Sequence, residues 1–210
     1  GDHMIVLEVI DNTNIWHRDT TQLTVYPRIP IVVINEVMKD CQQIVTDDVG
    51  EFIELYNLDN VPVDISGWKL SNSSSEFTVE EGISIPANSI YLLGRQQEDS
   101  NDNPNGGYAL DLVYNNIVLD NDSDHIQLHT SLDQLVDQFS YSGELSSNAT
   151  AKSMELIDPL LDNSDINTNW TVATELYGNY GLQGTPGYEN ALIPDYGNPT
   201  INEYSLEFNG

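Results

Sequence analysis

Positive charge is scarce in this sequence. Lysine and arginine together number 6, against 34 aspartate and glutamate residues, which gives a formal net charge of −28 at pH 7. Nucleic acids and anionic membranes bind proteins through clustered lysine and arginine side chains that displace counterions. The charge balance therefore predicts a protein without a nucleic-acid partner. Its acidic surface either suits cations or simply keeps the protein well solvated.

Cysteine and long hydrophobic runs are also scarce. Cys41 is the sole cysteine among 210 residues, so no intramolecular disulfide can form and the fold must rest on its core. No histidine is near Cys41 in the sequence, which favours a passive thiol over a nucleophile. No apolar stretch approaches the roughly 18 residues of a membrane span, so we expect no membrane insertion.

What the sequence does contain is a series of short, strand-like runs. Branched and aromatic residues gather in segments separated by Asn, Asp, Ser, Gly and Pro, and no segment keeps a helical period. The expected strands are IVVINEVM, EFIELYN, VPVDISGWKLS, SEFTVEE, ANSIYLLGR, YALDLVYN, DHIQLHTS, LVDQFSY, KSMELID and NWTVAT. In DHIQLHTS, Ile126 and Leu128 fall on one face and the histidines on the other. This number of short strands predicts an all-β, antiparallel two-sheet sandwich.

Breaks in the strand pattern divide the chain into four parts. Residues 1–4 resemble a remnant of an expression tag. Residues 5–30 form an N-terminal extension or the end of a preceding β domain, with IVLEVIDNTN pairing with TQLTVYP across NIWHRDTT. Residues 31–190 hold the sandwich, and residues 191–210 are a linker. Within the sandwich, the loop over 95–107 is so polar that we expect a mobile, acidic excursion.

The end of the sequence repeats its middle. The segment INEYSLEFNG begins at Ile201 with the same Ile-Asn-Glu that begins INEVMKD at Ile34. The stretch before it, 184–200, contains three of the nine prolines, as expected of a linker between tandem modules. We therefore expect Ile201 to Tyr204 to be the first strand of a second copy of the domain. The alternative is a chance match of a short hydrophobic tail.

The order of these motifs is similar to that of the lamin tail domain family. The matching stretches are INEVM (34–38), GEFIELYN (50–57), VDISGWKLSN (63–72), IPANSIYLL (85–93), DNDSDHIQLH, LVDQFSYSG, SMELID, NW and GTPGYEN. The resemblance covers residues 31–190 and is strongest to the bacterial branch, whose domains are carried on secreted and cell-surface proteins. It implies an immunoglobulin-like β-sandwich that binds or spaces other proteins and has no active site. Some animal members bind DNA, but the six cationic residues here are scattered.

The family motif has physical reasons in this sequence. Trp68 would place a large ring in the core, and Gly67 before it allows a backbone conformation closed to other residues. Ile53 and Leu55 share the core face of their strand. The opposite face would carry Phe52, Glu54 and Tyr56. In GTPGYEN, the glycines and proline at positions 184, 186 and 187 predict a sharp turn.

Two glutamates on adjacent strands are the first candidate site. Glu36 and Glu54 could lie close enough together for acid–base chemistry. The simpler interpretation is that they bind backbone groups or pair with Lys39 or Lys69.

The run Asp120, Asp122, Asp124 is the second candidate, because calcium loops place oxygen ligands at this spacing. The expected glycine is replaced by His125 and no glutamate follows at the twelfth position, so a polar β-turn is the favoured interpretation. His125 and His129 lie on one face of a strand, but their spacing of about 13 Å is too large for one metal ion.

These observations favour a noncatalytic module of a larger secreted or surface-anchored bacterial protein. We expect it to act in adhesion, spacing or protein binding, with other proteins or cell-surface components as partners, no cofactor and an extracellular location. The alternative is an accessory domain of an extracellular hydrolase with a calcium-assisted or carbohydrate-binding site. A glycan-binding face would expose aromatic side chains, for which the candidates are Tyr56, Tyr91, Tyr114 and Tyr141; burial in the core is the competing interpretation.

Overall fold

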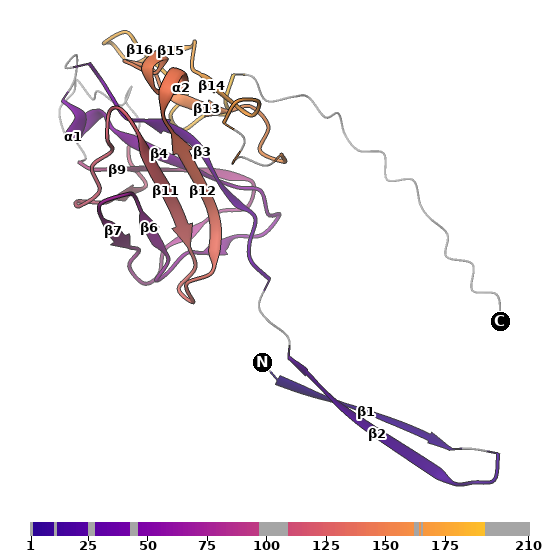
Figure 1. Cartoon of the computed structure of the whole chain (residues 1–210). Helices are drawn as coiled ribbons and strands as arrows, with labels where there is room; N and C mark the ends of the chain where they lie inside the picture. The colour runs from indigo at the N-terminus through magenta and orange to yellow at the C-terminus, as the bar shows by residue number, and fades with distance from the viewer. Residues whose placement is uncertain are drawn as a thin grey trace.

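In a computed structural model of the chain, the regular secondary structure is almost entirely β-strands, with two short helices among the described residues (Figure 1). The structure describes residues 2–10, 12–24, 28–42, 46–96, 109–161, 164 and 166–191. Most of the predicted acidic loop and the segment from Ile201 to Tyr204 lie outside these residues. The described part contains no helix that is long and apolar enough to cross a membrane.

An antiparallel hairpin precedes the sandwich. Strands β1 (Asp2–Ile10) and β2 (Trp16–Thr24) pair along their full length, from Asp2 with Thr24 to Ile10 with Trp16. The prediction of a hairpin is confirmed, but the predicted turn began too late in the sequence. The chain turns at the asparagines, where Asn14 has a φ of 64°, because asparagine tolerates this conformation and the following threonines prefer a strand.

The larger sheet of the sandwich has six strands, in the order β10-β9-β4-β3-β13-β14. Neighbouring strands are antiparallel except β9 and β10. The strands are β3 (Val32–Met38), β4 (Phe52–Asn57), β9 (Ser89–Gly94), β10 (Leu112–Val113), β13 (Met154–Leu156) and β14 (Trp170–Val172).

The second sheet has four strands, in the order β12-β11-β6-β7. Figure 1 shows it in front of the six-stranded sheet, so the two sheets form the predicted sandwich. Its strands are β6 (Lys69–Ser71), β7 (Glu76–Thr78), β11 (Asp124–His129) and β12 (Leu135–Tyr141). The remaining elements are the ladders β5 (Val63–Asp64) with β8 (Ser84–Ile85) and β15 (Leu176–Tyr177) with β16 (Leu182–Gln183), and the short helices α1 (Asp47–Gly50) and α2 (Gly143–Asn148).

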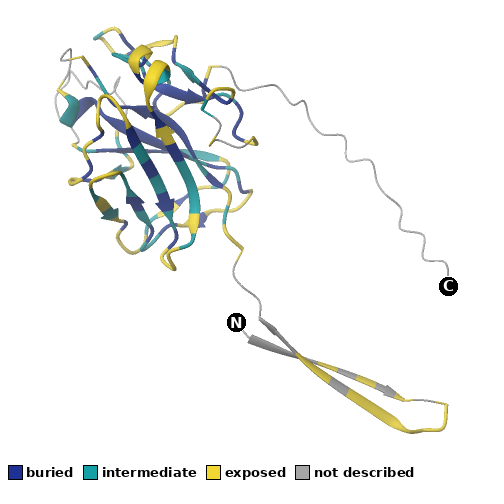
Figure 2. Cartoon of the chain, viewed as in Figure 1, coloured by how far each residue is buried: buried dark blue, intermediate teal, exposed yellow. Residues whose placement is uncertain are grey.

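The core lies between the two sheets and confirms the alternation seen in the sequence. Ile53 and Leu55 of β4 are buried against Ile126 and Leu128 of β11 in one continuous cluster (Figure 2). Trp68 joins the same cluster with 4% of its surface exposed. It follows a tight turn in which the Trp68 N–H donates to the carbonyl of residue 65, and the φ of +70° before it explains the glycine at position 67.

The outer face of β4, which carries Phe52 and Glu54, is buried as well. Phe52 and Glu54 are fully buried there, and Phe52 meets the ring of Tyr177 edge-on at 6.4 Å between centroids. The cover consists of the β15–β16 ladder and the segment Gly184–Ala191, which we call the strap. The linker-like composition of 184–200 is misleading for the strap, whose backbone is bound to the sheet, in keeping with the predicted sandwich limit at residue 190.

Candidate functional site

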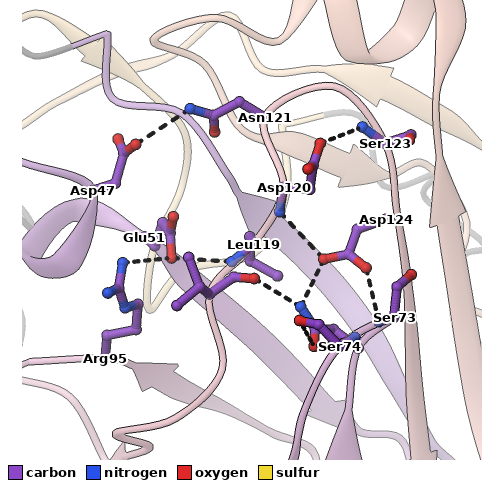
Figure 3. A pocket seen from close by; sticks show the side chains of 12 residues that line it. Asp47, Glu51, Ser73, Ser74, Arg95, Leu119, Asp120, Asn121, Ser123 and Asp124 are labelled. Carbon is purple, nitrogen blue, oxygen red and sulfur yellow. Dashed lines mark hydrogen bonds and ion pairs between the residues drawn. The ribbon is translucent and has the colours of Figure 1, made fainter.

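The first candidate site is an acidic pocket of about 460 Å³ at one end of the sandwich (Figure 3). Asp47 and Glu51 enter it from α1 and the residue after that helix, Asp120 from the loop before β11, and Asp124 from the first position of β11. Arg95, which follows β9, is the one cationic side chain in the wall. The pocket therefore combines four carboxylates with a single positive charge.

The aspartate run forms a polar turn in the wall of this pocket. One carboxylate oxygen of Asp120 accepts the N–H groups of Asp122 (2.8 Å) and Ser123 (3.0 Å). These backbone hydrogen bonds hold the pKa of Asp120 below its ordinary value. This is the geometry of the predicted β-turn. Among the described residues, no group of three or more His, Cys, Asp or Glu side chains is arranged as metal ligands.

Asp124 fastens the turn to the neighbouring loop. Its carboxylate accepts the N–H of Ser73 (3.0 Å) and the side-chain amide of Asn72 (2.8 Å), and also contacts the N–H of Asp120 (3.3 Å). Burial opposes ionisation of Asp124, but these hydrogen bonds outweigh it and hold its pKa below the ordinary value. The acidic pocket thus keeps charged carboxylates.

A buried carboxyl in the wall of the pocket faces a partly exposed arginine. Glu51 is 1% exposed, and its carboxylate lies 3.4 Å from the guanidinium of Arg95. Burial raises the pKa of Glu51 to about 8, although Arg95 acts in the opposite direction. Nearby, the buried amine of Lys39 donates to the backbone carbonyl of Asn121 at 2.7 Å, and burial lowers the pKa of Lys39.

The second candidate site is a row of glutamates on the outer face of the six-stranded sheet. In the strand register, Glu155 of β13 is paired with Glu36 of β3, which is paired with Glu54 of β4. All three are at most 1% exposed. The prediction that Glu36 and Glu54 lie close together is confirmed. We call these three residues the glutamate row.

The row binds the backbone of the strap. Glu36 accepts the hydroxyl of Ser153 and both the N–H (2.8 Å) and the hydroxyl (2.9 Å) of Thr185. Glu54 accepts the N–H of Gly187 at 2.7 Å. The role in satisfying backbone groups is confirmed.

The predicted lysine partners of the glutamates are wrong. The Lys39 amine donates to a backbone carbonyl next to the acidic pocket. Lys69 lies 3.3 Å from Asp133 and 3.9 Å from Glu76 on the other sheet.

Asn35 explains why the Ile-Asn-Glu motif includes asparagine. The register of β3 and β4 shifts between Ile34 and Glu36, and this bulge leaves Asn35 free to reach sideways. Its amide donates to Glu54 (2.7 Å) and to the side chain of Asn190 (2.9 Å). The amide of Asn190 in turn donates to the carbonyl of Asn35 at 3.0 Å. The end of GTPGYEN is thereby locked to the start of the domain.

The predicted turn in GTPGYEN is confirmed. The N–H of Tyr188 donates to the carbonyl of Thr185 at 2.8 Å, with Pro186 and Gly187 between them. Gly187 has a φ of 83°, as the third residue of a type II turn requires. This turn presents the N–H groups of Thr185 and Gly187 to the two glutamates.

Burial dominates the chemistry of the row. It raises the pKa of Glu36 to about 7, and the charge of Glu155 acts in the same direction. The pKa of Glu54 is well above its ordinary value because of burial and the neighbouring Glu36, and burial also raises that of Glu155. The strap covers these carboxylates, so they face other parts of the protein and not a substrate.

The other singled-out residues have structural surroundings. Tyr91, Tyr114 and Tyr141 are buried in the core, so core packing is the correct interpretation for them. The ring of His125 lies 2.5 Å from the hydroxyl of Ser140. Tyr56 is half-buried, and Cys41 is fully buried, which raises the pKa of its thiol.

Sequence reasoning missed Glu155 and the covering role of the strap. Glu54 and Glu155 each stand between two apolar residues in a predicted strand, and Glu36 follows Asn35. Such alternation predicts a solvated outer face, so the sequence carried no signal of their burial.

The family comparison agrees with this architecture. The lamin tail domain family matches residues 28–143, more than half of the chain. Among curated proteins, none matches the chain. The structure continues the same sandwich beyond the match, since β13 and β14 complete the six-stranded sheet. The chain belongs to the lamin tail domain family.

Proposed function

We propose that this domain is a noncatalytic spacing and protein-binding module of a larger secreted or surface-anchored bacterial protein. Family membership supports a noncatalytic immunoglobulin-like module. The main observation behind the proposal is that the buried glutamates have a structural role. Glu36 and Glu54, the best candidates for acid–base chemistry, hold the strap in place and are covered by it.

The chain is held by hydrogen bonds close to where the sandwich begins and close to where it ends, and this supports a spacing role. The guanidinium of Arg28 lies 2.6 Å from Asp59, whose carboxylate also accepts the N–H of Ile31 at 3.0 Å. Where the sandwich ends, the side-chain amide of Asn190 donates hydrogen bonds to the carbonyl of Asn35 and to the carbonyl of Leu156 (2.8 Å). Neighbouring segments attached at these points would keep a defined position relative to the sandwich.

Charge supports a partner with basic side chains. With a net charge of −28, the protein attracts cationic surfaces and repels anionic ones. The acidic pocket is the concave part of this surface, and its volume of about 460 Å³ is in the range of ligand-binding cavities. A lysine or arginine side chain of a partner protein fits both its size and its charge.

The experiment compares binding to immobilised peptides rich in lysine and arginine with binding to matched peptides rich in aspartate and glutamate. We expect the labelled domain to bind the basic peptides alone, and to lose affinity as salt screens the charges. Combining Asp47→Asn with Asp120→Asn should weaken binding more than combining Glu80→Gln with Glu81→Gln, which removes the same charge from exposed positions.

Each other outcome counts against the proposal. Equal losses in the two double variants would mean that binding is non-specific electrostatics, and no binding would contradict the binding role. The alternative, an accessory domain of an extracellular hydrolase with a calcium-assisted or carbohydrate-binding site, is tested with glycoside and phosphoester substrates. Turnover that depends on calcium and is lost in the pocket variant would favour it.

A further inference from the structure

We propose that the glutamate row is a proton-operated latch that keeps the strap closed while the row holds a proton and loosens it when that proton leaves. The inference does not depend on the binding role proposed above. It starts from the register of three strands, which places Glu155, Glu36 and Glu54 side by side on one face of the sheet. Backbones of paired strands lie only about 5 Å apart, so like charges in this arrangement repel each other.

Hydrogen-bond donors are unevenly distributed along the row. Glu36 receives three donors, and Glu54 receives the N–H of Gly187 and the amide of Asn35. From the described residues, Glu155 receives only the N–H of Ala191 at a long 3.4 Å, and its other carboxylate oxygen is buried with no hydrogen-bond partner among them. The donors can therefore stabilise negative charges on Glu36 and Glu54 but not a third charge on Glu155, so the row retains a proton.

Groups packed against the row add no positive charge. Besides burial, the charge of Glu175 acts on Glu155 and opposes its ionisation, and the charge of Glu36 in turn raises the pKa of the buried Tyr177. No lysine or arginine of the described residues forms an ion pair with the row. Raised pKa values of the glutamates agree with this surplus of negative charge.

The strap is packed too closely on the row to adjust to a new charge. A Cβ atom added to Gly184 would lie 2.7 Å from a carboxylate oxygen of Glu36 and 2.9 Å from the hydroxyl of Ser153. No atom can therefore be inserted between Gly184 and Glu36 while the strap is closed. When the last proton leaves, the third charge gains solvation only if the strap moves away.

Hydrogen exchange of the strap amides tests this latch. The amides of Thr185, Gly187 and Ala191 are followed between pH 5.5 and 8.5, and their rates are corrected for the base dependence of intrinsic exchange. In the wild type we expect the protection of these amides to fall by about tenfold or more across this pH range. Above the pKa of the row, each further pH unit changes the ratio of deprotonated to protonated row tenfold. Amides of β11, on the other sheet, serve as the internal reference.

Glu155→Gln separates the latch from a merely structural role. Glutamine keeps the acceptor for Ala191 and removes one charge, so this variant should keep the strap protected at pH 8.5. Glu80→Gln removes the same charge from an exposed position and should leave the wild-type pH profile unchanged. If Glu155→Gln fails to fold, Glu54→Gln replaces it. The pH dependence of strap protection in the wild type tests the latch in either case. Strap protection that is independent of pH in the wild type, or that changes as much in Glu80→Gln as in Glu155→Gln, would overturn the proposal.

Discussion

The acidic pocket and the glutamate row place the same chemical group in opposite environments. In the pocket, Asp120 and Asp124 accept several N–H groups, which lower their pKa values. In the row, Glu36 and Glu54 also accept N–H groups, but complete burial and mutual repulsion outweigh these bonds and raise their pKa values. Hydrogen bonds alone do not decide the charge of a carboxylate, because access to water and the neighbouring charges can reverse their effect.

The largest expected effect comes from removing the centre of the row. Glu36→Ala leaves the Ser153 hydroxyl and the two donors of Thr185 without an acceptor in a buried site. Each unsatisfied buried donor costs about 1–3 kcal/mol, and the effects overlap, so we expect a loss of about 3–5 kcal/mol in unfolding free energy. Urea denaturation measures it. A loss below about 1 kcal/mol would mean that the row does not hold the strap.

The pH dependence of stability should have opposite signs for the two regions. Glu36 binds its proton more tightly in the folded state, so its contribution is complete below pH 4.5 and is lost as pH rises to about 7. At 1.36 kcal/mol per pH unit, this loss is about 3 kcal/mol. Asp124 has a lowered pKa, so its contribution is present above pH 3.8 and is lost on further acidification. Denaturation midpoints across pH 3 to 9 should therefore peak near pH 4 to 5.

A smaller effect is expected from crowding the strap. Gly184→Ala places a methyl group against Glu36 and Ser153, and forced overpacking costs about 1–3 kcal/mol. Backbone strain does not contribute, because Gly184 does not have a positive φ. Thermal unfolding measures the change. Wild-type stability in this variant would show that the strap can move away from the row at little cost.

In the pocket, Asp124→Asn should cost less than any change in the row. Asparagine keeps an acceptor for Ser73 but loses the charge, which is worth about 1 kcal/mol in such hydrogen bonds. The difference from wild type should shrink as the pH falls through the lowered pKa of Asp124, because the wild-type carboxylate then gains a proton. A pH-independent difference would assign the effect to packing instead of charge.

The smallest expected effect is that of calcium. The oxygens of Asp120 and Asp124 that face the turn already accept N–H groups, so we expect millimolar calcium to leave the melting temperature unchanged. A rise in the wild type that is absent in Asp122→Ala would instead show calcium binding by mass action. That result would revive the calcium-assisted alternative.

Much of the sandwich could be predicted from alternation alone. Ile53, Leu55, Ile126 and Leu128 follow the period of a strand with one face in the core, and all four are buried there. Trp68 was also predictable, because its Ser-Gly-Trp motif fixes a turn that directs the ring inward. These features are local, and local sequence determines them.

The glutamate row could not be predicted from local pattern. Whether Glu36 meets water depends on the strap, about 150 residues later in the chain, and on a strand register that alternation does not fix. The same distance explains why the burial of Phe52, on the face opposite Ile53 and Leu55, could not be predicted. The aspartate run left two interpretations open, since Asx-turns and calcium loops share the same residues and differ in where the oxygens point. The missing glycine and glutamate favoured the turn, which the hydrogen bonds of Asp120 show.

Site-specific titration of the side-chain carboxyl carbons by NMR tests the account most directly. The account predicts that Glu36 titrates near pH 7, with Glu54 also well above pH 4.5, while Asp120 and Asp124 titrate below pH 3.8 in the same protein. Glutamates of the row that titrate at or below pH 4.5 would contradict it, because the strap would then rest on three stable charges and no proton would be held.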